Sequence, residues 1–121
     1  MAKRQSTVAL KRVYEKPEAI DGILVDRLWP HGLSKESAHV DIWLKEVAPS
    51  NELRKWFAHD PEKFIEFRRR YKVELASESH RKALTKLREI LSQGYVTLVF
   101  AAQDSEHSNA IVLRDVLSSG R

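Results

Sequence analysis

The sequence of 121 residues contains no cysteine, only four glycines and four prolines, and no long uninterrupted apolar run. Without cysteine the chain forms no disulfide, no thiolate zinc site and no covalent intermediate on a thiol. The most apolar stretch, residues 96–102, is interrupted by Thr97 and is far too short to cross a bilayer. The glycines match neither G-x-G-x-x-G nor G-x-x-x-x-G-K, which excludes a glycine-rich phosphate loop.

The composition indicates a folded protein rather than a disordered chain. Hydrophobic residues make up 42% and charged residues 31% of the sequence, which is enough apolar material for one core. The length is close to the commonest domain size, so we expect a single domain spanning residues 1–121. The first ten residues, MAKRQSTVAL, lack the apolar stretch of a signal peptide. We therefore expect a cytoplasmic protein with no membrane association.

The formal net charge of +4 favours anionic partners. An anionic small molecule fits this charge. Nucleic-acid binding is expected to be weak at most and strongly salt-dependent, because the charge is modest and no platform of aromatic and basic residues is evident.

Alternating or continuous apolar character predicts strands at residues 8–14, 23–25 and 95–101. Capping residues and helical periodicity predict helices after Ser50, after Asp60, over residues 79–93, and from Asp104 or Ser105 onward. Residues 95–101 are apolar on both sides, as is typical of a central parallel strand. Strands separated by helices predict an α/β fold, a three-layer α/β/α sandwich with a mostly parallel central sheet.

Residues 40–47 fit two patterns. Val40, Ile42 and Leu44 alternate as in a strand. Val40, Trp43, Leu44 and Val47 fit one face of a helix at least as well, so periodicity alone favours a helix.

Two polar segments follow predicted strands, residues 26–32 and residues 103–109. In open parallel sheets, ligands bind outside the carboxyl ends of the strands. If the two strands are neighbours, both segments emerge at one edge of the sheet and their side chains line one pocket.

Arg27 and Trp29 are candidate ligand-binding residues in the first segment. A guanidinium at the end of a buried strand seeks a carboxylate or phosphate, and Trp29 can stack on a planar ligand. The alternative is structural: Arg27 pairs with Asp26 or Asp104 inside the protein, and Trp29 belongs to the core. His31 is a further candidate for substrate binding.

The second segment supplies candidates for proton transfer, Asp104 and His107. Asp104 is equally well explained as a plain helix cap. Asn109 falls on the inward face of the last helix, where its buried amide needs a backbone or ligand partner. In the basic run of residues 68–72 only Arg68 flanks the buried stripe, so Arg68 is the binding candidate there and the rest is a solvated face.

The five histidines show no four-residue spacing that would place two ligands on one helix face. We expect no metal site and no cofactor, and we expect the chain to fold without metal.

The run VDRLWPHGLSK at residues 25–35 resembles the VDRLWPRG-x-x-K signature of the YeaO-like family, a branch of domain of unknown function 488. The runs WLK at 43–45, APS at 48–50, LRKWF at 53–57 and HDP at 59–61 resemble the family in the same order, and the resemblance extends over residues 8–117. It implies a three-layer α/β/α sandwich and a strand rather than a helix at residues 40–47. It implies no established activity.

Two departures from the family pattern bear on function. His31 stands where family members usually carry arginine, which weakens the expectation of a permanent anion at that position. The wider superfamily that the chain resembles looks to have a Cys-His-Arg run at the start of its last helix. This chain has Ser108, Asn109 and Ala110 at about that place. A thiol-based mechanism is therefore excluded.

Two function classes remain. The first is a small-molecule enzyme, or a degenerate enzyme, acting on an anionic ligand that is phosphorylated or nucleotide-like. The second is a non-catalytic module that binds a nucleotide, nucleic acid or protein. A deep crevice at the two strand ends favours the first, and a continuous basic ridge favours the second.

Overall fold

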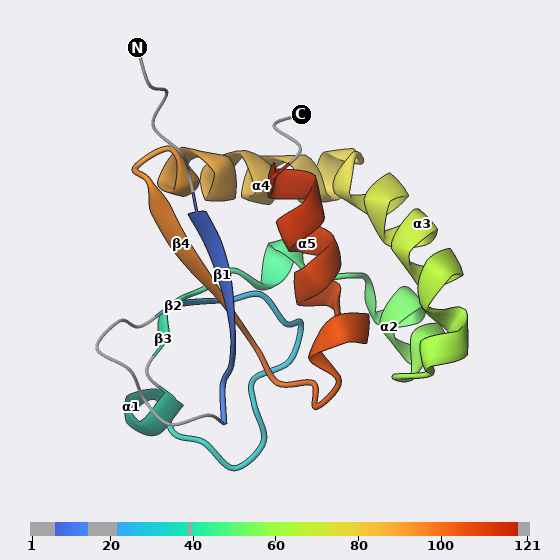
Figure 1. The fold of residues 1–121 in the computed structure, drawn as a ribbon, viewed down its shortest axis with the longest axis horizontal. Coiled ribbons are helices and arrows are strands. Elements are labelled where there is room, and N and C mark those ends of the chain that lie inside the picture. The colour runs from blue at the N-terminus through green and yellow to red at the C-terminus, as the bar shows by residue number, and fades with distance from the viewer. Residues whose placement is uncertain (1–6, 15–21, 39, 119–121) are drawn as a thin grey trace.

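The computed structural model describes residues 7–14, 22–38 and 40–118, and these form a four-stranded parallel sheet with helices packed against it (Figure 1). The strands are β1 (Thr7–Arg12), β2 (Gly22–Leu24), β3 (Val40–Trp43) and β4 (Tyr95–Phe100). Their order in the sheet is β1-β4-β2-β3, and all three pairings are parallel. The predicted α/β sandwich with a parallel central sheet is confirmed. That it is a single domain stays a prediction.

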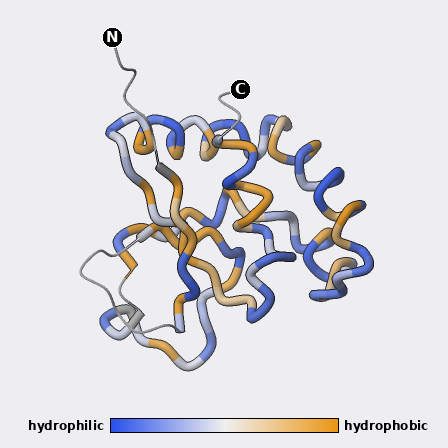
Figure 2. Tube along the Cα trace, in the orientation of Figure 1, coloured by the Kyte–Doolittle hydropathy of each residue, from blue (hydrophilic) through white to orange (hydrophobic). Residues whose placement is uncertain are grey.

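The helices are α1 (Lys35–Ala38), α2 (Asn51–Phe57), α3 (Phe64–Leu75), α4 (Glu78–Leu91) and α5 (Asn109–Ser118), with short 3-10 turns at Lys45–Val47, Pro61–Lys63 and Ser105–His107. Hydrophobic and hydrophilic residues alternate along α3 and α4 in Figure 2, as expected for helices with one buried side. No helix within the described ranges is long and apolar enough to cross a membrane.

The central position of β4 explains why its sequence is apolar on both sides. Val96, Leu98 and Phe100 belong to the larger core cluster, which they share with buried residues of α2, α3, α4 and α5. Val99 faces the other way, into a smaller cluster with Leu24. Trp29, Leu33 and Trp43 pack against this smaller cluster, so loop and strand side chains cover the second face of the sheet there.

Three of the predicted capping side chains, Ser50, Asp60 and Asp104, accept hydrogen bonds from backbone amides. The side chain of Ser50 accepts a hydrogen bond from the Leu53 amide at 3.1 Å, and that of Asp60 accepts from the Glu62 amide at 3.0 Å. Asp104 caps the 3-10 turn at Ser105–His107 rather than α5 itself, which begins after Ser108. These caps satisfy amide groups that a first helical turn leaves without partners.

Residues 40–47 divide between the two predicted patterns. The first half forms β3, as the family resemblance implies, and pairs with β2. The second half forms the 3-10 turn at Lys45–Val47, which buries Val47. Periodicity favoured a helix because Val47 is buried one turn after Trp43 and Leu44, although a strand and a short turn meet between them.

Gly22 sits where β2 approaches β4 most closely. A Cβ atom there would lie 2.6 Å from Cγ2 of Val99 and 2.7 Å from the backbone oxygen of Thr97, which cannot move without disturbing the sheet. We expect Gly22→Ala to lower the free energy of unfolding by about 1–3 kcal/mol, as overpacking does. Gly32→Ala is the control: its Cβ meets open space, and its positive φ of 81° costs about 1 kcal/mol. Urea denaturation of both variants tests this, and a smaller loss for Gly22→Ala than for Gly32→Ala would contradict it.

Candidate functional site

A cavity of about 600 Å³ lies at the carboxyl ends of β2 and β4. These strands are parallel neighbours, with Leu24 opposite Val99, so the segments that follow them emerge at one edge of the sheet. The residues that line the cavity are Asp26, Arg27, Leu28, Pro49, Arg54, Phe57, His59, Phe67, Ala101, Ala102, Gln103, Asp104, Ser108 and Asn109. Its volume falls within the range of about 300–1,000 Å³ that small-molecule sites occupy.

Arg27 is held by backbone oxygens rather than by a carboxylate. Its Nε donates to the Pro49 carbonyl at 3.2 Å and its Nη2 donates to the Ala48 carbonyl at 3.1 Å. In the described part of the chain no acidic side chain forms an ion pair with Arg27, so the expected structural pair with Asp26 or Asp104 is not made. The guanidinium is therefore positioned by the loop before α2 and keeps its charge unneutralised.

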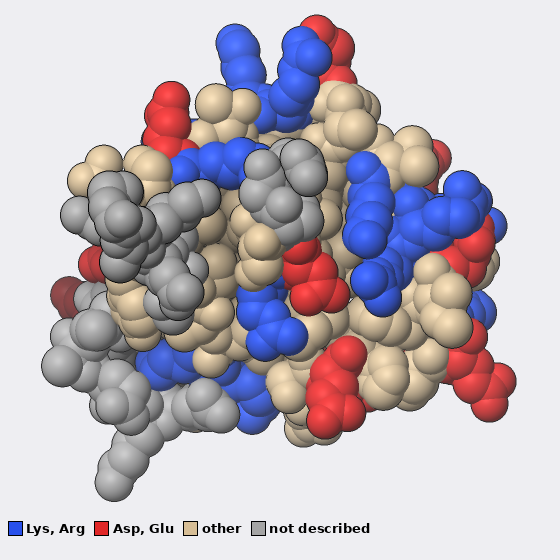
Figure 3. Space-filling view, turned by 45° about the horizontal axis from the view of Figure 1, so that its top comes forward, with Lys and Arg blue, Asp and Glu red and all other residues tan. Residues whose placement is uncertain are grey.

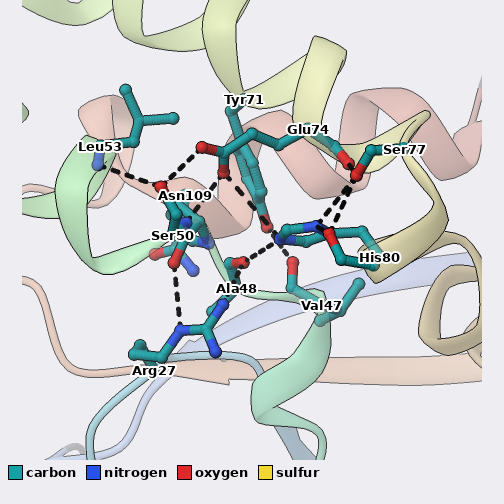
Figure 4. A network of polar contacts seen from close by, with 12 residues as sticks. Arg27, Val47, Ala48, Ser50, Leu53, Tyr71, Glu74, Ser77, His80 and Asn109 are labelled. Atoms are coloured by element: carbon teal, nitrogen blue, oxygen red, sulfur yellow. Dashed lines mark hydrogen bonds and ion pairs between the residues drawn. The ribbon is translucent and has the colours of Figure 1, made fainter.

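Buried side chains of α3 and α4 form hydrogen bonds with backbone carbonyls of the same loop (Figure 4). The Tyr71 hydroxyl donates to the Val47 carbonyl at 2.6 Å, and His80 Nε2 lies 2.8 Å from the Ala48 carbonyl that also accepts from Arg27. Because a carbonyl only accepts, Nε2 of His80 carries the proton. Burial raises the pKa of Tyr71, so its hydroxyl remains a donor.

The same loop is tied to α3 by Glu74. One carboxylate oxygen accepts from the Ser50 amide at 2.8 Å and the other accepts from the Ser50 hydroxyl at 2.6 Å. Ser50 thus caps α2 and anchors it at once, which fixes where α2 begins relative to Arg27.

Asp26 is a partly buried carboxyl group in the lining of the cavity. Its Oδ2 accepts a hydrogen bond from the Ala101 amide at 2.8 Å, which ties the end of β2 to the end of β4. Burial raises the pKa of Asp26, while the Ala101 amide, the Asn109 side chain and His59 pull the pKa down more weakly.

Arg54 brings a second guanidinium to the cavity from α2. Its Nη2 donates to the Asn51 side chain at 3.2 Å. Its Nε is buried and finds no hydrogen-bond acceptor among the residues that the structure describes. Buried polar atoms are nearly always paired, so this nitrogen stands out as a donor available to a ligand.

His59 reaches the cavity through an uncommon backbone turn. Ala58 and His59 both have positive φ angles, 48° and 59°, in the left-handed region that side chains other than glycine rarely adopt. The Ala58 amide donates to the Arg54 carbonyl at 3.0 Å, which is the usual way for such a residue to end a helix. The turn places His59 in the cavity lining, where its ring centroid lies 6.4 Å from that of Phe57.

The apolar part of the cavity is aromatic. Phe57 of α2 and Phe67 of α3 stack with ring centroids 4.2 Å apart and an angle of 16° between the rings. Leu28, Pro49, Ala101 and Ala102 extend this apolar lining.

Asp104 and His107 form an exposed pair at the start of the segment before α5. Nδ1 of His107 lies 2.7 Å from Oδ2 of Asp104, and this contact holds the pKa of Asp104 below its usual range. Asp104 lines the cavity, whereas the His107 ring packs edge-on against Phe64 with centroids 5.2 Å apart. Their role in proton transfer stays a prediction.

The remaining candidates from the sequence lie at different distances from the cavity. Asn109 lines it, and its amide donates to the Val25 carbonyl at 3.0 Å. Trp29 packs in the second apolar cluster, where its Nε1 donates to the Leu33 carbonyl at 2.7 Å. His31 is exposed on the following turn.

Arg68 is turned towards α5, 3.9 Å from the Asp115 carboxylate, and does not line the cavity. The structure therefore brings Arg27, Asp104 and Asn109 together, and it does not bring Trp29, His31, His107 or Arg68 to the same lining. No group of three or more acidic or histidine side chains in the described ranges is arranged to hold a metal.

Sequence reasoning missed Asp26, Arg54 and His59 as cavity residues. A signal existed for each: Asp26 adjoins Arg27, Arg54 lies in the family-like run at 53–57, and His59 lies in the family-like run at 59–61.

Comparisons with known proteins place the chain in a family without giving it an activity. Residues 7–120 match the family model described as the inactive DUF488-N3 subclade. An uncharacterised protein of Mycobacterium tuberculosis strain H37Rv is 44% identical over 117 residues, covering 95% of this chain and 97% of that protein. The uncharacterised protein YeaO of Escherichia coli K12 is 40% identical over 114 residues, covering 93% of this chain and 97% of YeaO. No solved structure matches the chain.

The anchoring of Arg27 predicts a stability cost for its removal. Arg27→Ala deprives the Pro49 and Ala48 carbonyls of a charged donor, so we expect the free energy of unfolding to fall by about 1–3 kcal/mol. Arg69→Ala, on the exposed face of α3, should change it by about 0.5 kcal/mol or less. Guanidinium denaturation of the two variants compares them directly, and equal losses would refute the anchoring role.

Burial of Asp26 predicts a pH-dependent effect of Asp26→Asn. Because the pKa of Asp26 is raised in the folded state, the folded chain binds this proton more tightly, and stability from this group is lost as pH rises through the folded pKa. Asparagine keeps an oxygen for the Ala101 amide without the buried charge. We expect the variant to melt at a higher temperature than the unchanged chain at pH 7, with the difference vanishing as pH falls towards the ordinary value of 3.8. A difference that grows at low pH would contradict this.

Proposed function

The chain belongs to the inactive DUF488-N3 subclade of YeaO-like proteins, and from its cavity we propose that it binds a small organic anion without transforming it. The observation that carries the proposal is the presence of two guanidinium groups, Arg27 and Arg54, in the lining of one cavity. Neither forms an ion pair with a carboxylate in the described part of the chain. Arginine binds phosphate and carboxylate groups through paired hydrogen bonds, so such an anion suits these two side chains.

The acidic side chains at the cavity do not form ion pairs with the two guanidinium groups in the described part of the chain. The Asp104 carboxylate is engaged by His107 and by the amides of Glu106 and His107. Asp26 forms no ion pair with Arg27 or Arg54 in the described part of the chain, and its Oδ2 accepts from the Ala101 amide instead. The aromatic lining formed by Phe57 and Phe67 suits the uncharged body of an organic ligand.

The position of the superfamily thiol supports binding without turnover. Ser108 stands there, lines the cavity, and donates its hydroxyl proton to the Ser105 carbonyl at 3.2 Å. A serine nucleophile needs an adjacent base to take its proton, and the Ser108 hydroxyl donates to the Ser105 carbonyl rather than to an imidazole. The description of the matching family as inactive agrees with this arrangement.

The alternative of a nucleic-acid or protein surface has less support. Figure 3 shows Lys and Arg side chains in several groups, the broadest at the right of the view, with Asp and Glu side chains and uncharged surface between the groups. A pocket with few charged groups suits a small ligand better than a polyanion.

Arg54→Gln tests the proposal with inorganic phosphate as the probe. We expect isothermal titration to show about tenfold weaker phosphate binding or more, because a hydrogen bond to a charged group is worth about 1.5–3 kcal/mol. The matched control is Lys55→Gln, which removes the same charge from an exposed position of α2 and should change the dissociation constant less than about twofold.

Equal weakening by both variants would show that only net charge matters, and absence of phosphate binding to the unchanged chain would reject the site. Turnover of a phosphate ester by the unchanged chain would favour the enzyme alternative instead.

A further inference from the structure

Asp26 is an unexpected group in a cavity that binds anions. A carboxylate beside the ligand repels it, and its structural contact with the Ala101 amide needs only one oxygen. An asparagine would make that contact without repulsion. The negative group therefore calls for a second function, and its position at the cavity lining points to the ligand.

We propose that Asp26 accepts a hydrogen bond from a hydroxyl group of the same ligand, so that the cavity selects hydroxylated phosphate esters over simple anions. This inference rests on the proposed anion site and names its ligand class, which includes sugar phosphates and nucleoside monophosphates. An ionised carboxylate has about four acceptor positions. The Ala101 amide occupies one and the Asn109 side chain is a second donor to the carboxyl group, which still leaves acceptor positions for a ligand.

The backbone around Asp26 is held rigidly enough to orient its carboxylate. The carbonyl of Asp26 accepts from Nε1 of Trp43 at 2.8 Å. The preceding residue, Val25, donates its amide to the Val99 carbonyl at 3.0 Å and accepts from the Asn109 amide at 3.0 Å. A polar group fixed in this way recognises a ligand without a large ordering cost.

The charged residues of the cavity lining come from different elements of the fold. Arg54 and His59 approach from α2 and the turn after it, Arg27 from the end of β2, and Asp104 from the segment after β4. Asp26 lines the same cavity as Arg54 and Arg27, so a phosphate ester bound by these arginines has its organic part in a cavity that also contains the Asp26 carboxylate. The aromatic lining of Phe57 and Phe67 covers the remaining apolar surface.

Two phosphate monoesters separate the hydroxyl contact from the anion contact. Ribose 5-phosphate carries hydroxyl groups, and ethyl phosphate carries the same anion without them. By isothermal titration at one pH and salt concentration, we expect the unchanged chain to bind ribose 5-phosphate about tenfold more tightly or better, as one hydrogen bond to a charged group provides. This comparison needs no variant, so it does not depend on a substitution being tolerated.

Asp26→Asn should reduce the preference to less than about threefold, and it should strengthen ethyl phosphate binding because the repulsion is removed. The control, Asp41→Asn on the exposed strand β3, should keep the full preference. A purely structural role for Asp26 would weaken both esters equally and leave the ratio unchanged.

Binding of both esters with no preference by the unchanged chain would overturn the inference and leave the anion site intact. An unchanged preference in Asp26→Asn would also overturn it. Failure of both esters to bind the unchanged chain would reject the anion site and this inference with it.

Discussion

The two hydrogen bonds from Arg27 to the Ala48 and Pro49 carbonyls connect the end of β2 to the loop that starts α2. The position of α2 depends on them, and α2 in turn brings Arg54 and Phe57 to the cavity. The Ala48 carbonyl is shared with His80, so the loop is held from the sheet and from α4 at once. A structural contact of one arginine thereby places the second arginine, which has a donor left for a ligand.

Each charged group at the cavity is accounted for by a different contact. Arg27 binds backbone oxygens, Asp104 binds His107, and Asp26 binds the Ala101 amide. Only Arg54 keeps a buried nitrogen without an acceptor in the described residues. This unpaired guanidinium nitrogen, rather than the net charge of the protein, supports binding of an anion. The other charged side chains named here already have hydrogen-bond partners within the protein.

The place of the cavity could be predicted from the sequence, because polar segments that follow neighbouring parallel strands must meet at one sheet edge. The individual residues could not. Asp26 was interpreted only as a partner of Arg27. Nothing in the sequence shows that its carboxylate accepts a hydrogen bond from the Ala101 amide, just after β4. The direction of Arg54 depends on how α2 packs against α3, and Trp29 lies in the second apolar cluster because the loop folds back over that face.

A crystal structure of the protein with ribose 5-phosphate tests the central claim most directly. The account predicts the phosphate within hydrogen-bond distance of the Arg54 guanidinium and a ribose hydroxyl against the Asp26 carboxylate, with the Arg27 contacts to Ala48 and Pro49 unchanged. A ligand bound elsewhere on the surface, or an Arg54 side chain turned to an internal carboxylate with the cavity closed, would contradict it.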